Sequence, residues 1–175
     1  GGHVRDLRRL LELPLHPDHS EAESGYTGLP PVGTTALMLA AFYGHLEAVR
    51  LLRDAGSDAR RATTNGATAL SLASANISVE VEMVRVLCDA GADKDKAMSD
   101  GSSALTMASA NGRAAVVRVL CDEGADVNKA TDAGFTALIA ASANGHAAVA
   151  RVLLKAGADP DQVIDNGTTA LIAAS

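Results

Sequence analysis

The segment from His16 to Glu23 gathers residue types that bind transition metals. Two imidazoles and three carboxylates occur in it, at His16, Asp18, His19, Glu21 and Glu23. Zinc and similar ions need three or four such ligands held in place by a supporting shell of hydrogen bonds. Here the ligands alternate with proline and polar residues, and no regular spacing orients them. We therefore expect no metal site in this segment, and no other cofactor in the chain.

Two cysteines, Cys88 and Cys121, occupy equivalent positions in a repeating pattern described below. One interpretation of that spacing is a pair of redox-active thiols. Stacked helices lie about 8–10 Å apart, however, which is beyond the reach of a disulfide between equivalent positions. We expect both to be free thiols that serve packing.

General-base chemistry would need a histidine beside a nucleophile or a metal. His45 and His146 each follow a glycine at the same point of the repeating pattern, which favours a role at the start of a helix. The sequence has no glycine-rich phosphate loop ending in Lys-Ser/Thr, no nucleophile elbow and no His-Glu-x-x-His motif. We expect the chain not to be an enzyme.

Composition narrows the class of protein further. Of 175 residues, 47% are apolar but only 2% are aromatic, so small side chains must let backbones pack closely. No apolar run approaches the roughly 20 residues that span a bilayer, and no signal segment opens the chain. We expect no membrane insertion and a cytoplasmic location, with the nucleus as the alternative. The formal charge of −6 argues against a nucleic-acid partner.

A short motif ending in aspartate recurs through the chain. It occurs as Gly-Ser-Asp at 56–58 and as Gly-Ala-Asp at 91–93, 124–126 and 157–159, with spacings of 35, 33 and 33 residues. A second motif places Thr or Ser two residues after a glycine, and both are favoured helix N-caps. These caps are Thr35, Thr68, Ser103, Thr136 and Thr169.

Each unit contains two helical patterns and a loop. After the cap come leucine and alanine at helical spacing, and a glycine ends this first helix, at Gly44, Gly112 and Gly145. A second apolar stripe follows, with its members at Val49 and Leu52, Val84 and Leu87, Val117 and Leu120, and Ala150 and Leu153. About ten polar residues then lead to an Asn-Gly or Asp-Gly turn, which predicts a projecting hairpin-like loop.

A 33-residue unit with Gly-x-Thr-Ala-Leu, Ala-Ala/Ser-x-x-Gly-His and Leu-x-x-x-Gly-Ala-Asp resembles the ankyrin repeat. The resemblance implies an all-α repeat solenoid of helix-turn-helix units with hairpin-like finger loops. It departs from the family pattern after the cap, where alanine replaces proline and the following histidine is Met38, Ser71, Thr106, Ile139 or Ile172.

The predicted boundaries comprise four full repeats with irregular segments at both ends. The full repeats are 33–65, 66–100, 101–133 and 134–166, and the second carries a two-residue insertion in its helix-helix turn. Residues 1–12 resemble the second helix of a partial repeat, 13–32 an extended loop, and 167–175 the first helix of a further partial repeat. We expect the chain to be a fragment, and to be monomeric as such.

Four arginines recur in the second helices, at Arg50, Arg85, Arg118 and Arg151. Three of them have an acid four residues on, at Asp54, Asp89 and Asp122. This spacing predicts local ion pairs on a solvated helix face.

The resemblance implies a protein-interaction module that binds a protein or peptide through its finger tips and concave helix face. One alternative is a targeting or regulatory segment of a larger enzyme, such as a kinase or ubiquitin ligase, and another is a structural spacer. We expect the main contact patch at Phe42, Tyr43, Arg60 and Arg61, with Asp161 and Asp165 setting the partner's direction. The other predicted contact residues are Asn76, Asn111 and Asn144 in the helix turns and Lys94, Lys96, Lys129 and Asp132 in the fingers.

Overall fold

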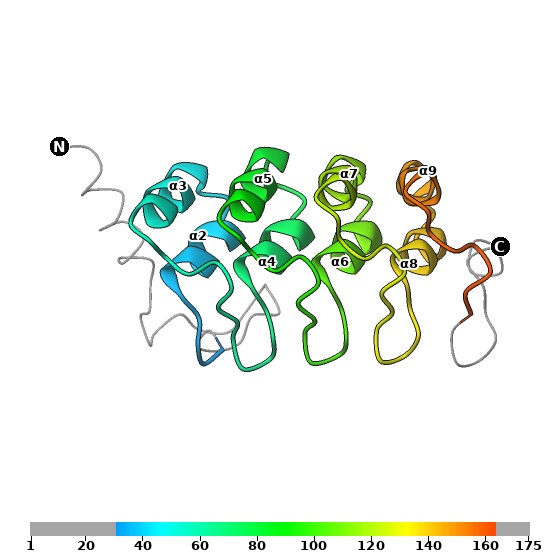
Figure 1. Ribbon diagram of the computed structural model, residues 1–175, viewed down its shortest axis with the longest axis horizontal. Helices are drawn as coiled ribbons and strands as arrows, with labels where there is room; N and C mark the ends of the chain where they lie inside the picture. Colours follow the sequence, from blue (N-terminus) through cyan, green and yellow to red (C-terminus); the bar gives the residue numbers. More distant parts are fainter. Residues whose placement is uncertain (1–30, 164–175) are drawn as a thin grey trace, which may run out of the picture.

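The computed structural model describes residues 31–163, and within them the chain forms four pairs of short helices. The pairs are α2 (Ala36–Phe42) with α3 (Leu46–Asp54), α4 (Ala69–Ala75) with α5 (Val81–Asp89), α6 (Ala104–Ala110) with α7 (Ala114–Asp122), and α8 (Ala137–Ala143) with α9 (Ala147–Lys155). The first helices form one layer and the second helices another, and loops project from one side of the stack (Figure 1). The predicted all-α repeat solenoid is confirmed.

The first helix of each pair has only seven residues and begins at the predicted cap. The side chain of each Thr or Ser cap accepts a hydrogen bond from the backbone N–H three residues on. At Thr68 the exchange is reciprocal, because the Ser71 hydroxyl oxygen also accepts from the Thr68 N–H at 3.0 Å. Such caps satisfy N–H groups that have no partner inside the helix.

Alanine makes the first-helix layer tight. Ala40, Ala73, Ala108 and Ala141 have no exposed surface, and the first helices that carry them pack in series, α2 on α4, α4 on α6 and α6 on α8. The second helices add larger fully buried side chains, among them Val49, Val84, Leu87, Val117, Leu120 and Leu153. In α9 the predicted stripe residue Ala150 is partly buried against the core, as Leu52 is in α3, and Val149 beside it is fully buried.

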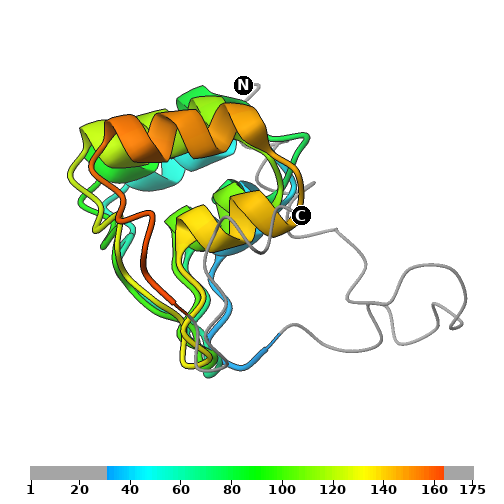
Figure 2. The same cartoon turned by 90° about the vertical axis from the view of Figure 1, so that its right-hand side faces the viewer.

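The fingers are hairpin-like, and each bonds to the next. Within a finger the chain folds back through a backbone bond, as from the Met98 N–H to the Ser102 carbonyl at 2.9 Å. Between fingers, the Ser99 N–H donates to the Asn65 carbonyl at 2.9 Å and the Asp132 N–H to the Asp100 carbonyl at 3.1 Å. In Figure 2 the aligned fingers run down past the first-helix layer. Neighbouring repeats are therefore joined at the fingers as well as through the helices.

The two extra residues of the second repeat lie in the turn between α4 and α5, which has five residues where the other helix pairs have three. Val79 in this turn is buried, whereas Ile77 is exposed. Arg113 of the next repeat binds the irregular backbone, since its guanidinium donates to the Ala73 carbonyl at 2.7 Å and to the Val79 carbonyl. The insertion is thus held by the repeat that follows it.

The close approach of neighbouring fingers yields the first prediction. Gly101 and Gly124 both have positive φ, at +80° and +84°, but a Cβ on Gly101 would lie 2.5 Å from the Asp132 nitrogen, whereas one on Gly124 would meet nothing within 4 Å. Gly124→Ala should cost about 1–2 kcal/mol of backbone strain. Gly101→Ala should cost a further 1–3 kcal/mol, because a finger backbone must move.

Urea unfolding of both variants measures the difference, and Gly124→Ala is the matched control for the φ penalty. Equal losses of unfolding free energy would contradict the close finger packing.

Candidate interaction surface

The first helices α2, α4, α6 and α8 and the fingers beside them together form one face of the array (Figure 2). Within the first helices, the positions that stay partly exposed include an apolar residue two places after the buried leucine. These residues are Leu39, Leu72 and Met107, whereas their counterpart in α8, Ala140, is buried. This row was not predicted from the sequence, although its fixed position in the repeat was a usable signal. Three large apolar side chains in line provide anchors for a partner.

An aromatic corner stands at the first helix-helix turn. Phe42 is partly buried at the end of α2, and Tyr43 beyond it is 52% exposed. Their rings meet edge to face at 5.1 Å, and Tyr43 stacks on His45 at 6.2 Å between ring centres. The sequence also allows these rings to pack against the extended loop 13–32, of which residues 13–30 lie outside the described residues. The exposed Tyr43 extends the apolar row at its first repeat.

The three turn asparagines differ in what they bind. The Asn76 amide donates to the Phe42 carbonyl at 2.6 Å, and its oxygen accepts from the Ser78 N–H at 2.9 Å. The amides of Asn111 and Asn144 instead donate to carbonyls of their own first helices. Asn76 therefore joins the first two repeats, while the other two sit on single repeats.

The first finger's arginines also have different environments. The Arg60 Nε donates to the Gly91 carbonyl of the next repeat at 3.1 Å. The same position carries Asp95 and Asn128, whose side-chain oxygens accept from backbone N–H groups of the following repeat at 2.9 and 2.8 Å. Arg60 thus serves the joint between repeats, in addition to any contact with a partner.

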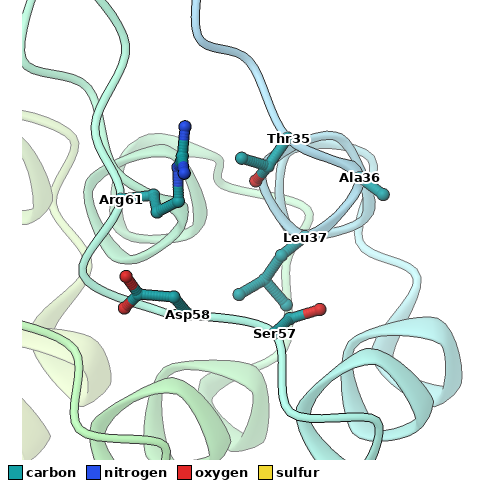
Figure 3. Close-up of a pocket in the computed structure, with 6 residues that line it drawn as sticks. All are labelled: Thr35, Ala36, Leu37, Ser57, Asp58 and Arg61. Atoms are coloured by element: carbon teal, nitrogen blue, oxygen red, sulfur yellow. The ribbon is translucent and has the colours of Figure 1, made fainter.

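Arg61 lies one residue further on and is exposed. Figure 3 shows its side chain beside a small hollow lined by Thr35, Leu37 and Asp58, where the first finger passes the start of α2. Lys96 and Lys129 hold the same position in the next two fingers. A row of three cations along the fingers results.

The remaining predicted contacts are spread along the fingers. Lys94 is half-buried, whereas Asp132 and Asp161 are exposed. The Asp161 N–H donates to the Asp159 carboxylate at 2.9 Å, which turns the chain at the base of the last finger. Asp165 lies outside the described residues. The structure therefore does not bring the predicted contacts into one cluster but distributes them over several repeats.

The ion pairs expected along the second helices are wrong at all three positions, because Arg50, Arg85 and Arg118 do not pair with the acid four residues on. Its guanidinium lies 3.4 Å from the Glu47 carboxylate and 3.5 Å from Glu82 of the next repeat, while Asp54 pairs with Arg53 at 2.8 Å. Within residues 31–163, Arg85, Arg118 and Arg151 make no ion pair. At Arg50 the i+4 pair fails because Glu47 on the same helix and Glu82 on the neighbouring helix hold the guanidinium instead.

The cysteines and His146, whose side chains could do chemistry, have structural surroundings instead. Cys88 and Cys121 are both free, as predicted. His146 begins α9, but its ring contacts the Ala110 carbonyl of the previous repeat at 3.0 Å and makes no capping bond. In the described part of the chain no group of three His, Cys, Asp or Glu side chains could hold a metal ion. The segment from His16 to Glu23 lies outside it.

Stacked helix pairs joined by linked hairpin-like fingers define the class of repeat solenoids with short two-helix units. A family model described as ankyrin repeats in three copies matches residues 2–98 and again 82–164. The chain belongs to the ankyrin repeat family. No curated protein matches it. None of the helices in residues 31–163 is long and apolar enough to cross a membrane.

The asparagine contacts predict a split between stability and binding. Asn76→Ala should lower the free energy of unfolding by about 1 kcal/mol, because it leaves the Phe42 carbonyl without its inter-repeat donor. Asn144→Ala is the matched control and should cost less, since its amide binds a carbonyl of its own helix and joins no neighbouring repeat. Urea unfolding of the two variants checks the order, and a larger loss for Asn144→Ala would refute the linking role of Asn76.

The thiols should react slowly and unequally. Burial raises the pKa of Cys88 to about 11 and also raises that of Cys121, so each holds less thiolate than an unfolded cysteine at the same pH. In the native protein, Cys121 should be alkylated faster than the more buried Cys88. In the unfolded protein, the two thiols should be alkylated rapidly and at equal rates. Mass spectrometry of iodoacetamide-treated protein checks this, and faster native alkylation of Cys88 would contradict it.

Proposed function

We propose that this chain is a non-catalytic protein-interaction module that binds a protein or peptide across its first helices and fingers. The observation that carries the proposal is the line of half-exposed apolar side chains Leu39, Leu72 and Met107, extended by the exposed Tyr43. Membership of the ankyrin repeat family supports it, because these repeats are generally protein-interaction modules.

The spacing of the row suits an extended partner. Neighbouring packed helices lie about 8–10 Å apart. An extended or polyproline-type chain advances about 3.1–3.4 Å per residue, so every third residue of a partner would meet a new repeat. A peptide with apolar side chains at that interval would fill successive repeats, and each contact would bury apolar area at roughly 25 cal/mol per Å².

The charges of the fingers favour one orientation of the bound partner along the array. The first finger carries Arg60 and Arg61, whereas the last carries Asp159 and Asp161. A partner that is acidic toward the first repeat and basic toward the fourth is therefore favoured. Exposed charges of this kind raise the association rate more than the affinity. Since Arg60 is also tied to Gly91, the cleaner electrostatic probes are Arg61 and Lys96.

The test is selection of binding peptides from a displayed library, followed by variants of the apolar row. Tyr43→Ala and Met107→Ala should each weaken the selected peptides by about five- to tenfold, as loss of an anchor does. Ile77→Ala is the matched control, because Ile77 is an exposed apolar residue in the α4–α5 turn. Its affinity should equal that of the parent chain.

Reversing Arg61 and Lys96 to Glu should slow association and reduce its salt dependence. Isothermal calorimetry measures the affinity, and stopped-flow mixing measures the association rate. If the folded variants of Tyr43 and Met107 bind as tightly as Ile77→Ala, or if no peptide is selected, the proposed surface is wrong.

A further inference from the structure

A second surface feature lies on the opposite layer, between the outer faces of α7 and α9. It is an open groove of about 520 Å³. Arg118 and Cys121 line it from α7, and Arg151, Val152 and Lys155 line it from α9. All three cations are exposed, whereas Cys121 and Val152 are half-buried. The groove thus has a partly apolar lining beneath a set of positive charges.

The positive charge arises because α9 lacks acids that earlier second helices carry at the equivalent positions. Arg50 is paired with Glu82 across the α3–α5 boundary at 3.5 Å. Opposite Arg118, the position equivalent to Glu82 is Ala148. Lys155 stands where the three earlier repeats have aspartate, at Asp54, Asp89 and Asp122.

The α7–α9 groove differs in charge from the equivalent grooves between the other second helices. The nine positions lining the α7–α9 groove carry three cations and one carboxylate. The equivalent positions between α5 and α7 carry two cations and three carboxylates, and those between α3 and α5 carry three of each. Among the described residues, Arg118, Arg151 and Lys155 have no ion-pair partner.

We propose that this groove binds an acidic segment of a partner protein, at a site separate from the first-helix and finger surface. Carboxylates of the segment pair with Arg118, Arg151 and Lys155, and its apolar side chains contact Cys121 and Val152. Charge complementarity favours this occupant, because three cations converge on a groove that holds only one carboxylate.

Nucleic acid and anionic lipid fit the groove less well. Tight phosphate-backbone binding needs many lysines and arginines to release counterions, whereas this chain has three in the groove and a formal charge of −6 overall. A phosphate backbone also brings no apolar side chain to cover Cys121 and Val152. A peptide with both carboxylates and apolar side chains satisfies both parts of the lining.

The test uses a short fluorescent peptide rich in Glu and Leu, with a version in which Gln replaces Glu. The acidic peptide should bind the whole chain at low salt, and the Gln version should bind at least about tenfold more weakly because the complementary charges carry the contact. Arg151→Glu with Lys155→Glu should weaken the acidic peptide by about tenfold and reduce its salt dependence.

Arg85→Glu is the matched control, since Arg85 holds the same place on α5 but lines a groove with more acids than bases. It should change the affinity by less than about twofold, as a distant surface charge does. Bound peptide should slow alkylation of Cys121 and leave that of Cys88 unchanged. Met107→Ala should not alter binding, which separates this site from the surface of the proposed function.

Four results would overturn the proposal. One is equal binding of the Glu and Gln peptides, and another is an equal loss of affinity in Arg85→Glu and in the Arg151/Lys155 variant. The third is binding of duplex DNA or phosphatidylserine vesicles through the same cations while the acidic peptide fails to bind. Full protection of Cys121 with no effect of the charge reversals would likewise assign the contact to apolar packing alone.

Discussion

The rest of the structure depends on the lateral packing of seven-residue helices through alanine faces. A helix of this length is not stable alone in water, because nucleation costs more than so few hydrogen bonds return. Thr and Ser caps lower that cost, but only neighbouring repeats supply buried area. Ala40, Ala73, Ala108 and Ala141 make the approach close enough. Each repeat is therefore stable only as part of the stack, and changes at one boundary affect the repeats on both sides.

Polar joints between repeats use different side chains for one purpose. Asn76, Arg113 and His146 each reach from a helix-helix turn to a backbone carbonyl near the end of the previous first helix. The carbonyls at such a helix end lack partners within the helix, so these bonds satisfy groups that burial would otherwise penalise. An amide, a guanidinium and an imidazole are interchangeable here because each offers an N–H at a similar reach.

Prediction from sequence succeeded where the signal is local and repeated. Thr35 and Thr68 identify caps because the capping bond spans only three residues, and Cys88 and Cys121 were assigned as free from their equivalent register. It failed where a side chain serves another repeat. Nothing in the spacing of Asn76 or Arg60 shows that each binds a backbone carbonyl of a neighbouring repeat.

Surface features that depend on a neighbouring repeat or on the second helix layer were likewise not predictable from the sequence. Leu39, Leu72 and Met107 were not singled out because a leucine in an apolar helix is indistinguishable from core until the second layer is placed. Arg50 was assigned to Asp54 because the sequence shows only its own helix. The structure adds Glu82, which approaches from the next one. Contacts that depend on how repeats are stacked therefore need the three-dimensional arrangement.

Packing leaves the outer positions of the second helices free to vary. Ala148 and Lys155 are exposed, and no core contact requires an alanine at the first or a lysine at the second. An exposed ion pair contributes only about 0–1 kcal/mol, so losing the acids found at Glu82 and Asp122 changes stability little. It does change the groove, where Arg118, Arg151 and Lys155 repel one another with a single carboxylate nearby. A cluster of like charges has no benefit for folding, and the reason for its presence is best sought in what binds there.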